Sequence, residues 1–224
     1  MNGGICLFLA SAASVGRGAL TTIARMDDEA GAIQLDNHFL IAMPGVRDEP
    51  FARSVVYVCE HSPHGAMGFI INKPGSFDMR ELFRRVNLPL GRAELGVQPV
   101  FLGGPLQPER GFVLHERMTV EGMAPDESLY ASTLSVAGGL EVTASRDVLE
   151  AVAAGGGPPR LLMALGFSSW GAGQLEAEIA RNDWLTVGAD VALMFEAPVE
   201  QRYERALALL GMQAWMLTSE AGHA

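Results

Sequence analysis

The chain has 224 residues, of which 49% are hydrophobic and 19% are charged, so it holds enough apolar material for one packed core and is not a disordered chain. Its formal net charge of −10 at pH 7 repels a phosphate backbone, which disfavours direct nucleic-acid binding. The two cysteines, Cys6 and Cys59, are far apart, which argues against a disulfide framework and favours a reducing compartment.

The first 25 residues stand apart from the rest. They contain a short apolar run at 5–10 but lack the positively charged segment of a secretory signal. The run is also too short to cross a bilayer, which takes about 20 apolar residues. We expect 1–25 to be either a disordered extension or, as we favour, sequence upstream of a true start at Met26, followed by a single domain over 30–224. The protein is then expected to be cytoplasmic and not membrane-bound.

Strands are predicted for the first part of this domain. The apolar segment 38–45 predicts a buried strand, and 53–61 is β-branched and aromatic enough for a second one. A third strand, 65–75, follows after a short polar turn, so the second and third are expected to form an antiparallel hairpin.

Helices and strands then alternate. Asp78 and Glu81 form an N-cap pairing that predicts a helix over 79–87. The nearly continuous apolar run 160–167 predicts a central strand buried on both faces. The other predicted strands are 99–104, 111–117, 132–136, 140–143 and 191–197, with a tight loop over 105–111. Three other helices are predicted. One is capped by Ser145 and runs through Ala153, and the other two cover 168–182 and 201–212. Without a strict βαβ rhythm, this order indicates an α+β or mixed α/β fold.

Cys59, His61 and His64 are candidate zinc ligands, with Glu60 or His115 as a fourth. Alternation along a strand places Cys59 and His61 on one face and Glu60 on the other. We favour the simpler interpretation, a buried structural cysteine beside two turn histidines, and assign no metal.

The junction after 160–167 carries two further hypotheses. Ser168 and Ser169 stand near a strand-to-helix turn, as in a hydrolase nucleophile elbow, but Trp170 replaces the second glycine of that motif. Gly171 and Gly173 expose backbone N–H groups at a helix start, where an anion can dock. The favoured alternative is that these glycines permit close packing while Trp170 fills the core.

A polar cleft is the remaining candidate site. Gly103 and Gly104 allow unusual backbone angles next to the polar loop that carries Glu109 and Arg110. The alternative, which we favour somewhat, is an Arg–Glu ion-pair network that ties loops together. The predicted ligand-binding residues are Arg53, Asn72, Lys73, Gly103, Gly104, Glu109, Arg110, Gly171 and Gly173, and no catalytic residue or cofactor is assigned.

Several phrases taken together resemble the YqgE/AlgH family, also called uncharacterised protein family 0301. The resemblance covers the chain from about Leu35 to Ala224. It implies a bifurcated sheet with a small closed barrel, surrounded by helices. It also implies a bacterial cytosolic protein without an established activity, although some members carry the name of a transcriptional regulator. The phrases are NHFLIAMPG (37–45), FARSVVYVCEH (51–61), GAMGFIINKP (65–74), FLGGPLQPERGFVLH (101–115), WGAGQLEAEI (170–179), NDWL (182–185) and AGHA (221–224).

These observations favour a non-enzymatic binding or regulatory protein that acts through a small anionic ligand or a protein partner. The alternative is an enzyme that uses the polar cleft on a small anionic substrate. No pair of helices joined by a Gly-containing turn carries a basic second helix, so a helix-turn-helix is not predicted.

Overall fold

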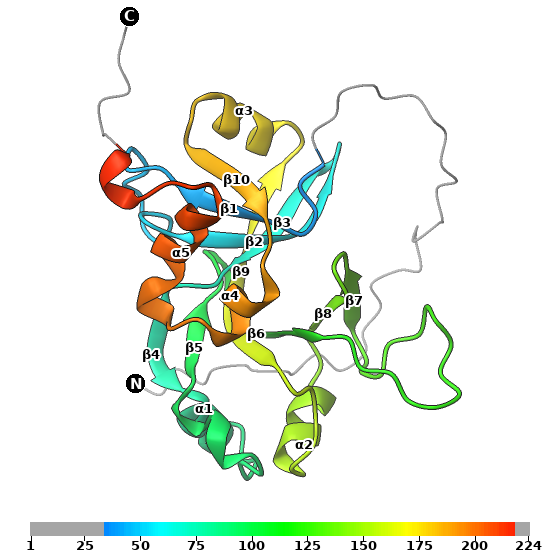
Figure 1. The fold of residues 1–224 in the computed structure, drawn as a ribbon. Coiled ribbons are helices and arrows are strands. Elements are labelled where there is room, and N and C mark those ends of the chain that lie inside the picture. Colours follow the sequence, from blue (N-terminus) through cyan, green and yellow to red (C-terminus); the bar gives the residue numbers. More distant parts are fainter. Residues whose placement is uncertain (1–33, 218–224) are drawn as a thin grey trace, which may run out of the picture.

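A computed structural model describes residues 34–217 of the chain (Figure 1). The extension predicted at 1–25, Cys6 and the AGHA phrase lie outside the described residues. Within 34–217, no helix is long and apolar enough to cross a bilayer.

Ten strands of this part of the chain join into one sheet, with five α-helices around it, so the predicted mixed class is confirmed. The strands are β1 (His38–Ala42), β2 (Val55–Ser62), β3 (Gly65–Ile70), β4 (Pro74–Asp78), β5 (Pro99–Leu102), β6 (Leu106–Glu116), β7 (Thr133–Val136), β8 (Leu140–Thr143), β9 (Leu161–Gly171) and β10 (Trp184–Gly188). The helices are α1 (Met79–Arg85), α2 (Asp147–Ala153), α3 (Gln174–Ala180), α4 (Val191–Glu196) and α5 (Arg202–Leu209). Short 3-10 helices lie at Ala93–Val97, Val199–Gln201 and Ala214–Met216.

The sheet branches at β9. Its main strand order is β10-β1-β2-β3-β9-β6-β8-β7, while β5 pairs with both β9 and β4. The first half of β9 pairs antiparallel with β6 and parallel with β5, and its second half pairs with β3. The central strand predicted at 160–167 is therefore confirmed.

The curled sheet is an open half-barrel. Strands β10 and β7 end the strand order, and in the described part of the chain they do not pair with each other. A closed barrel requires pairing between the first and last strands of the sheet. The small closed barrel that the resemblance implied is therefore not confirmed, and the bifurcation takes the form of the branch at β9.

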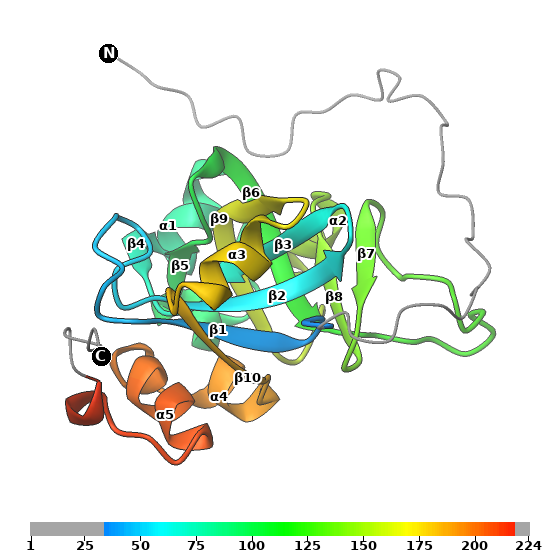
Figure 2. The same ribbon diagram turned by 90° about the horizontal axis from the view of Figure 1, so that it is seen from above.

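Side-chain alternation buries both faces of the β1–β3 half of the sheet. On β1, Phe39 and Ile41 face one layer, whereas Leu40 and Ala42 face the other. The first layer is covered by α4 and α5 and the second by α3, on opposite sides of the sheet (Figure 2). Helices α1 and α2 pack against β5, β6 and β9, and the side chains at this contact form a third hydrophobic cluster.

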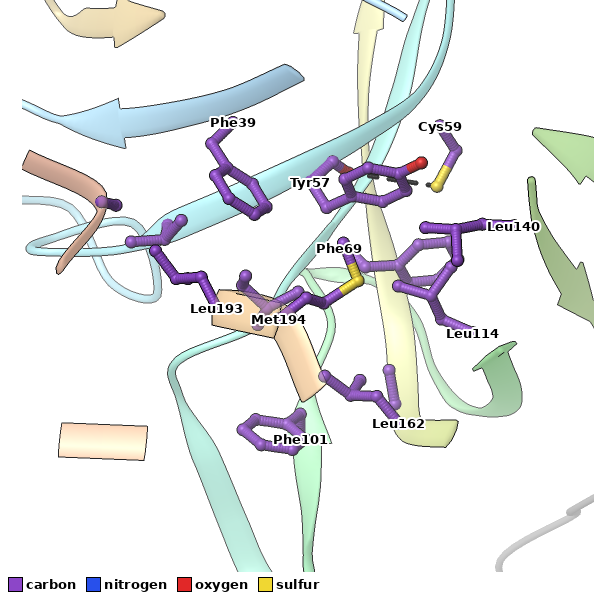
Figure 3. Close-up of a cluster of buried hydrophobic side chains, with 14 of the residues drawn as sticks. Phe39, Tyr57, Cys59, Phe69, Phe101, Leu114, Leu140, Leu162, Leu193 and Met194 are labelled. Carbon is purple, nitrogen blue, oxygen red and sulfur yellow. Dashed lines mark hydrogen bonds between the residues drawn. The ribbon is translucent and has the colours of Figure 1, made fainter. Parts of the chain in front are cut away.

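Helix α4 fills the inside of the curl. Its Leu193 and Met194 project among the inward side chains of both halves of the sheet (Figure 3). Burial of each such side chain is worth about 1.5–3 kcal/mol. The strands contribute Phe39, Tyr57, Phe69, Phe101, Leu114, Leu140 and Leu162.

The prediction of a strand at 191–197 is wrong, because this segment forms helix α4. The Asp190 side chain accepts the N–H of Leu193 at 2.8 Å and so caps the helix. A short apolar run does not distinguish a buried strand from a buried helical turn. Asp190 was the sequence signal for the helix.

Other boundaries also differ from the prediction. Strand β9 continues to Gly171, so the helix predicted at 168–182 begins only at Gln174. The tight loop predicted over 105–111 is mostly strand, because β6 starts at Leu106 and passes through an irregular register before Gly111. Strand β10 was not predicted.

Local capping signals gave mixed results. The Glu81 N–H donates to Asp78 Oδ1 at 2.9 Å, which confirms the cap of α1. The antiparallel hairpin of β2 and β3 is confirmed as well. Ser145 does not cap α2, because its hydroxyl bonds to the Ala131 carbonyl and to Asp147 instead.

We predict that Gly104→Ala destabilises the fold by about 2–4 kcal/mol. Gly104 has φ +157°, and a Cβ there would lie 2.2 Å from the carbonyl carbon of Phe167 in β9. Gly45 has open space around it, so Gly45→Ala is the matched control with a small expected effect. Urea denaturation of both variants tests this, and equal free energies of unfolding would contradict it.

Candidate functional site

A cavity of about 480 Å³ lies at the C-terminal end of β9, and we call it the aromatic pocket. Its walls come from the segment 45–51, the start of β6, helix α3 and the start of β10. It is lined by Gly45, Val46, Arg47, Asp48, Glu49, Pro50, Phe51, Pro105, Leu106, Ser169, Trp170, Gln174, Glu178, Arg181, Asp183 and Trp184.

Glu178 organises this pocket. Its Oε2 atom accepts the indole N–H of Trp170 and that of Trp184, each at 2.8 Å. Its Oε1 atom accepts the side-chain amide of Gln174 at 3.0 Å. One carboxylate on α3 therefore fixes aromatic side chains from two strands that are not neighbours in the sheet.

The aromatic rings form a connected group. The Phe51 centroid lies 6.3 Å from that of Trp170 and 5.7 Å from that of Trp184, and the two indoles are 6.2 Å apart. Phe51 and Trp184 meet edge to face, as do the two indoles, which is a favoured geometry for aromatic pairs. Both tryptophans are buried.

Local sequence explains the position of each group. Gln174 and Glu178 are four residues apart, so they lie on the same face of α3. Gln174 also accepts the N–H of Gly171 at 3.0 Å, which ties the start of the helix to the end of β9. Asn182, with φ +60°, ends the helical segment and turns the chain toward Trp184.

Charges in the lining are unbalanced. Four carboxylates, Asp48, Glu49, Glu178 and Asp183, face two guanidinium groups, Arg47 and Arg181. Arg181 pairs with Asp183 at 3.1 Å. Glu178, by contrast, takes its hydrogen bonds from uncharged donors.

The predicted cleft residues Arg53, Asn72 and Lys73 lie close together but have structural partners. Asn72 accepts the N–H of Val55 at 2.7 Å and donates to the Arg53 carbonyl at 2.9 Å, so it joins two chain segments. The exposed Arg53 side chain lies over the Tyr203 ring and 3.4 Å from Glu204. Lys73 is 3.9 Å from Glu49.

Gly103 and Gly104 serve close backbone contact. Gly103 is buried between the Leu165 carbonyl, to which its N–H donates at 2.8 Å, and Ile70, whose N–H its carbonyl accepts at 2.9 Å. Glu109 and Arg110 are exposed on β6, and Arg110 donates to Gln107 at 3.2 Å. No contact joins this pair to Arg53, Asn72 or Lys73 among the described residues.

Gly171 and Gly173 flank the aromatic pocket at the start of α3. Gly171 already donates its N–H to Gln174, and Gly173 has φ +72° and precedes the first residue of the helix. Their geometry serves the turn from β9 into α3.

A β-bulge separates the candidate zinc ligands, so the predicted shared face for Cys59 and His61 is wrong. The pairing of β2 with β3 shifts register between Val58 and Glu60. A single extra residue inverts the alternation that follows it. Cys59 therefore joins the inner cluster, whereas His61 Nε2 lies 3.0 Å from Glu176 of α3. No group of three or more potential metal ligands occurs within residues 34–217.

The nucleophile-elbow reading is also wrong, because β9 runs straight through Ser168 and Ser169. Ser168 is buried and its hydroxyl bonds to the Gly103 carbonyl at 3.3 Å. A strained strand-to-helix turn, which the elbow requires, does not occur at this position.

The residues of the aromatic pocket were missed by sequence reasoning. The prediction that Trp170 fills the core is confirmed, because the side chain is buried in a hydrophobic cluster. Sequence reasoning assigned no role to Glu178 beyond its helix and no element to Trp184. A signal for the contact was present in the sequence. Trp170 and Trp184 stand on either side of a helix that carries Gln174 and Glu178 on one face, and a buried indole needs an acceptor for its N–H.

We predict that Asn72→Ala destabilises the protein by about 2 kcal/mol, because it leaves the Val55 N–H and the Arg53 carbonyl without their partner. Its neighbour Lys73 makes one long, partly exposed ion pair, so Lys73→Ala is expected to change stability by less than about 0.5 kcal/mol. Thermal denaturation of both variants compares them, and a large loss for Lys73→Ala alone would contradict this assignment.

We predict that buried His115 makes stability fall in mild acid. Desolvation lowers the pKa of His115 below its ordinary value of 6.5. Its Nδ1 donates to the Glu116 carbonyl, so Nε2 accepts from Thr143, and both nitrogens are used by the neutral ring. The unfolded chain binds a proton below about pH 6.5 that native His115 does not bind, so acid favours unfolding.

The expected slope is at most about 1.4 kcal/mol per pH unit below pH 6.5. Urea denaturation at about pH 7.5 and pH 5.5 measures it, and His115→Gln removes this component. An identical pH dependence in the wild type and in His115→Gln would disprove the assignment.

Comparisons with known proteins agree on one relationship. The AlgH-like family model matches residues 39–215. The chain is 60% identical to a UPF0301 protein of Acidovorax sp. (strain JS42) and 58% identical to one of Variovorax paradoxus (strain S110). Both matches span 199 residues and cover 89% of this chain and all of the relative.

Solved structures show the same fold. The solution structure of the AlgH protein from Pseudomonas aeruginosa superposes with a TM-score of 0.65 at 43% identity, covering 88% of this chain and 100% of that chain. A Corynebacterium diphtheriae protein matches with a TM-score of 0.60 at 20% identity, over 80% of this chain and 88% of that one. This chain therefore belongs to the AlgH-like, or UPF0301, family, as the phrases in its sequence indicated.

Proposed function

We propose that the protein is a non-enzymatic binding protein that recognises a lysine or arginine side chain of a protein partner in the aromatic pocket. The observation that carries this proposal is the Glu178 carboxylate, which lies among three aromatic rings and is held by uncharged donors. Carboxylates and aromatic side chains are the groups that bind organic cations in proteins.

The charge of the lining supports a cation. Because Arg181 pairs with Asp183 and Glu49 pairs with Lys73, the remaining lining carries the carboxylates of Asp48 and Glu178 against Arg47 alone. A pocket with this excess of negative charge attracts a basic side chain and repels an anion. The small anionic ligand expected from the sequence has less support, because the Gly171 N–H already donates to Gln174.

Binding without catalysis is supported by the state of the nucleophilic groups. Burial raises the pKa of the Cys59 thiol well above its ordinary value, which disfavours the reactive thiolate. Ser168 is buried and bonded to a backbone carbonyl. In this proposal the protein acts in regulation by binding a partner protein. The alternative is an enzyme that acts on a small anionic substrate.

The test uses tripeptides of the form acetyl-Gly-X-Gly-amide, with X as arginine, lysine, glutamine or glutamate. The arginine and lysine probes are expected to shift the NMR signals of the Trp170 and Trp184 indole N–H groups, with a Kd on the order of 1 mM. The exposed Trp215 indole is the internal reference within the same spectrum.

Glu178→Gln retains an oxygen for the indole N–H groups but removes the charge, so it is expected to weaken arginine binding about tenfold. Glu150→Gln is the matched control, because Glu150 lies on α2, outside the pocket lining, and pairs with Arg146. Stronger shifts with the glutamate probe, or arginine binding that Glu178→Gln leaves unchanged, would overturn the proposal.

A further inference from the structure

A second feature lies at the seam of the half-barrel, away from the aromatic pocket. Strand β1 pairs with β2 only along 55–58, and β2 then continues to Ser62. The loop after β7 contacts β2 through Tyr57, whose hydroxyl is 3.2 Å from Asn37 Oδ1 and 3.4 Å from the Ala137 carbonyl. The loop after β7 therefore approaches β2 and the start of β1 at Tyr57.

Beside this junction the seam opens into a cavity of about 560 Å³, which we call the seam slot. One wall is β7 with the residue that follows it, and the other wall is the segment 34–38 with the end of β2. The slot is lined by Gln34, Asp36, His38, Cys59, Glu60, Leu134, Ser135 and Ala137.

The β7 wall is a strand edge that is unpaired in the described part of the chain. Within residues 34–217, β7 pairs only with β8, so the N–H and C=O groups on its outer side have no strand partner. Leu134 is 37% exposed and Ser135 is also exposed. Natural edge strands are protected by short length, a charged side chain, a proline or a bulge. With four residues β7 is short, but its sequence Thr-Leu-Ser-Val contains no charge or proline, and its register with β8 is regular.

The opposite wall is acidic. Glu60 is exposed and forms no ion pair among the described residues, and Asp36 adds a second carboxylate, which accepts the His61 N–H at 2.7 Å. These charges select against a second copy of this chain, whose own slot and net charge of −10 are also negative.

We infer that the seam slot binds an extended segment of a partner protein, which adds to β7 as a further strand and directs basic side chains toward Glu60 and Asp36. Backbone hydrogen bonds to the β7 edge provide affinity, and alternate side chains provide specificity. The occupant is a peptide with lysine or arginine at every second position, because successive side chains of a strand point to opposite faces.

The probe is the heptapeptide acetyl-Lys-Val-Lys-Thr-Lys-Val-Lys-amide, added to the full chain. The expected result is slower hydrogen exchange at the β7 amides and NMR shifts at Leu134 and Ser135. A peptide with proline in place of the threonine and both valines is the matched control, because it has the same charge but lacks the backbone N–H groups of those three residues and is poorly suited to a strand. It is expected to bind at least about fivefold more weakly.

Glu60→Gln is expected to weaken binding of the heptapeptide about fivefold, and Glu121→Gln, on an exposed loop, is expected to leave it unchanged. Glu178→Gln distinguishes this site from the aromatic pocket. In this variant the heptapeptide is still expected to slow hydrogen exchange at the β7 amides. The inference is overturned by the absence of β7 protection at millimolar peptide, by equal binding of the proline peptide, or by binding that depends on Glu178 instead of Glu60.

Discussion

Strand β9 holds the branches of the sheet together, because it pairs with three other strands. It pairs with β5 and β6 along its first half and with β3 along its second half. Backbones can approach β9 this closely only where side chains are missing, and a Cβ at Gly103 would lie 2.3 Å from the Gly166 carbonyl oxygen. The glycines that looked like a binding loop in the sequence therefore allow the sheet to branch.

The branch also explains where binding surfaces arise. Strand β9 stays paired with β3 up to its end at Gly171, and the chain then turns back over the sheet as α3. Glu178 on that helix takes both indole N–H groups, so the fold places a charged carboxylate in an aromatic setting. The seam slot arises at the other margin, where the curl brings β7 toward the end of β2 without pairing.

Prediction from the sequence was accurate where a local signal had one structural meaning. Asp78 with Glu81 capped α1 as expected, and the apolar run at 160–167 was the central strand. It was inaccurate where the same residues suit two structures. The run 191–197 is apolar enough for a strand, but it packs inside the curl as a helix. The bulge at Cys59 left no clear signal, because one extra residue changes the face of His61 without changing the composition of the strand.

The family, the mixed class of helices and strands, the central strand and the acidic character of the chain follow from the sequence, because they depend on composition, periodicity and motifs. The three-dimensional fold was needed to show that Asn72 bridges two chain segments, that Glu178 joins Trp170 to Trp184, and that β7 is an open edge among the described residues. These features depend on contacts between residues that are distant along the chain. Local pattern holds no information about which strands meet, so the geometry of the site follows from the branch at β9 and not from any single motif.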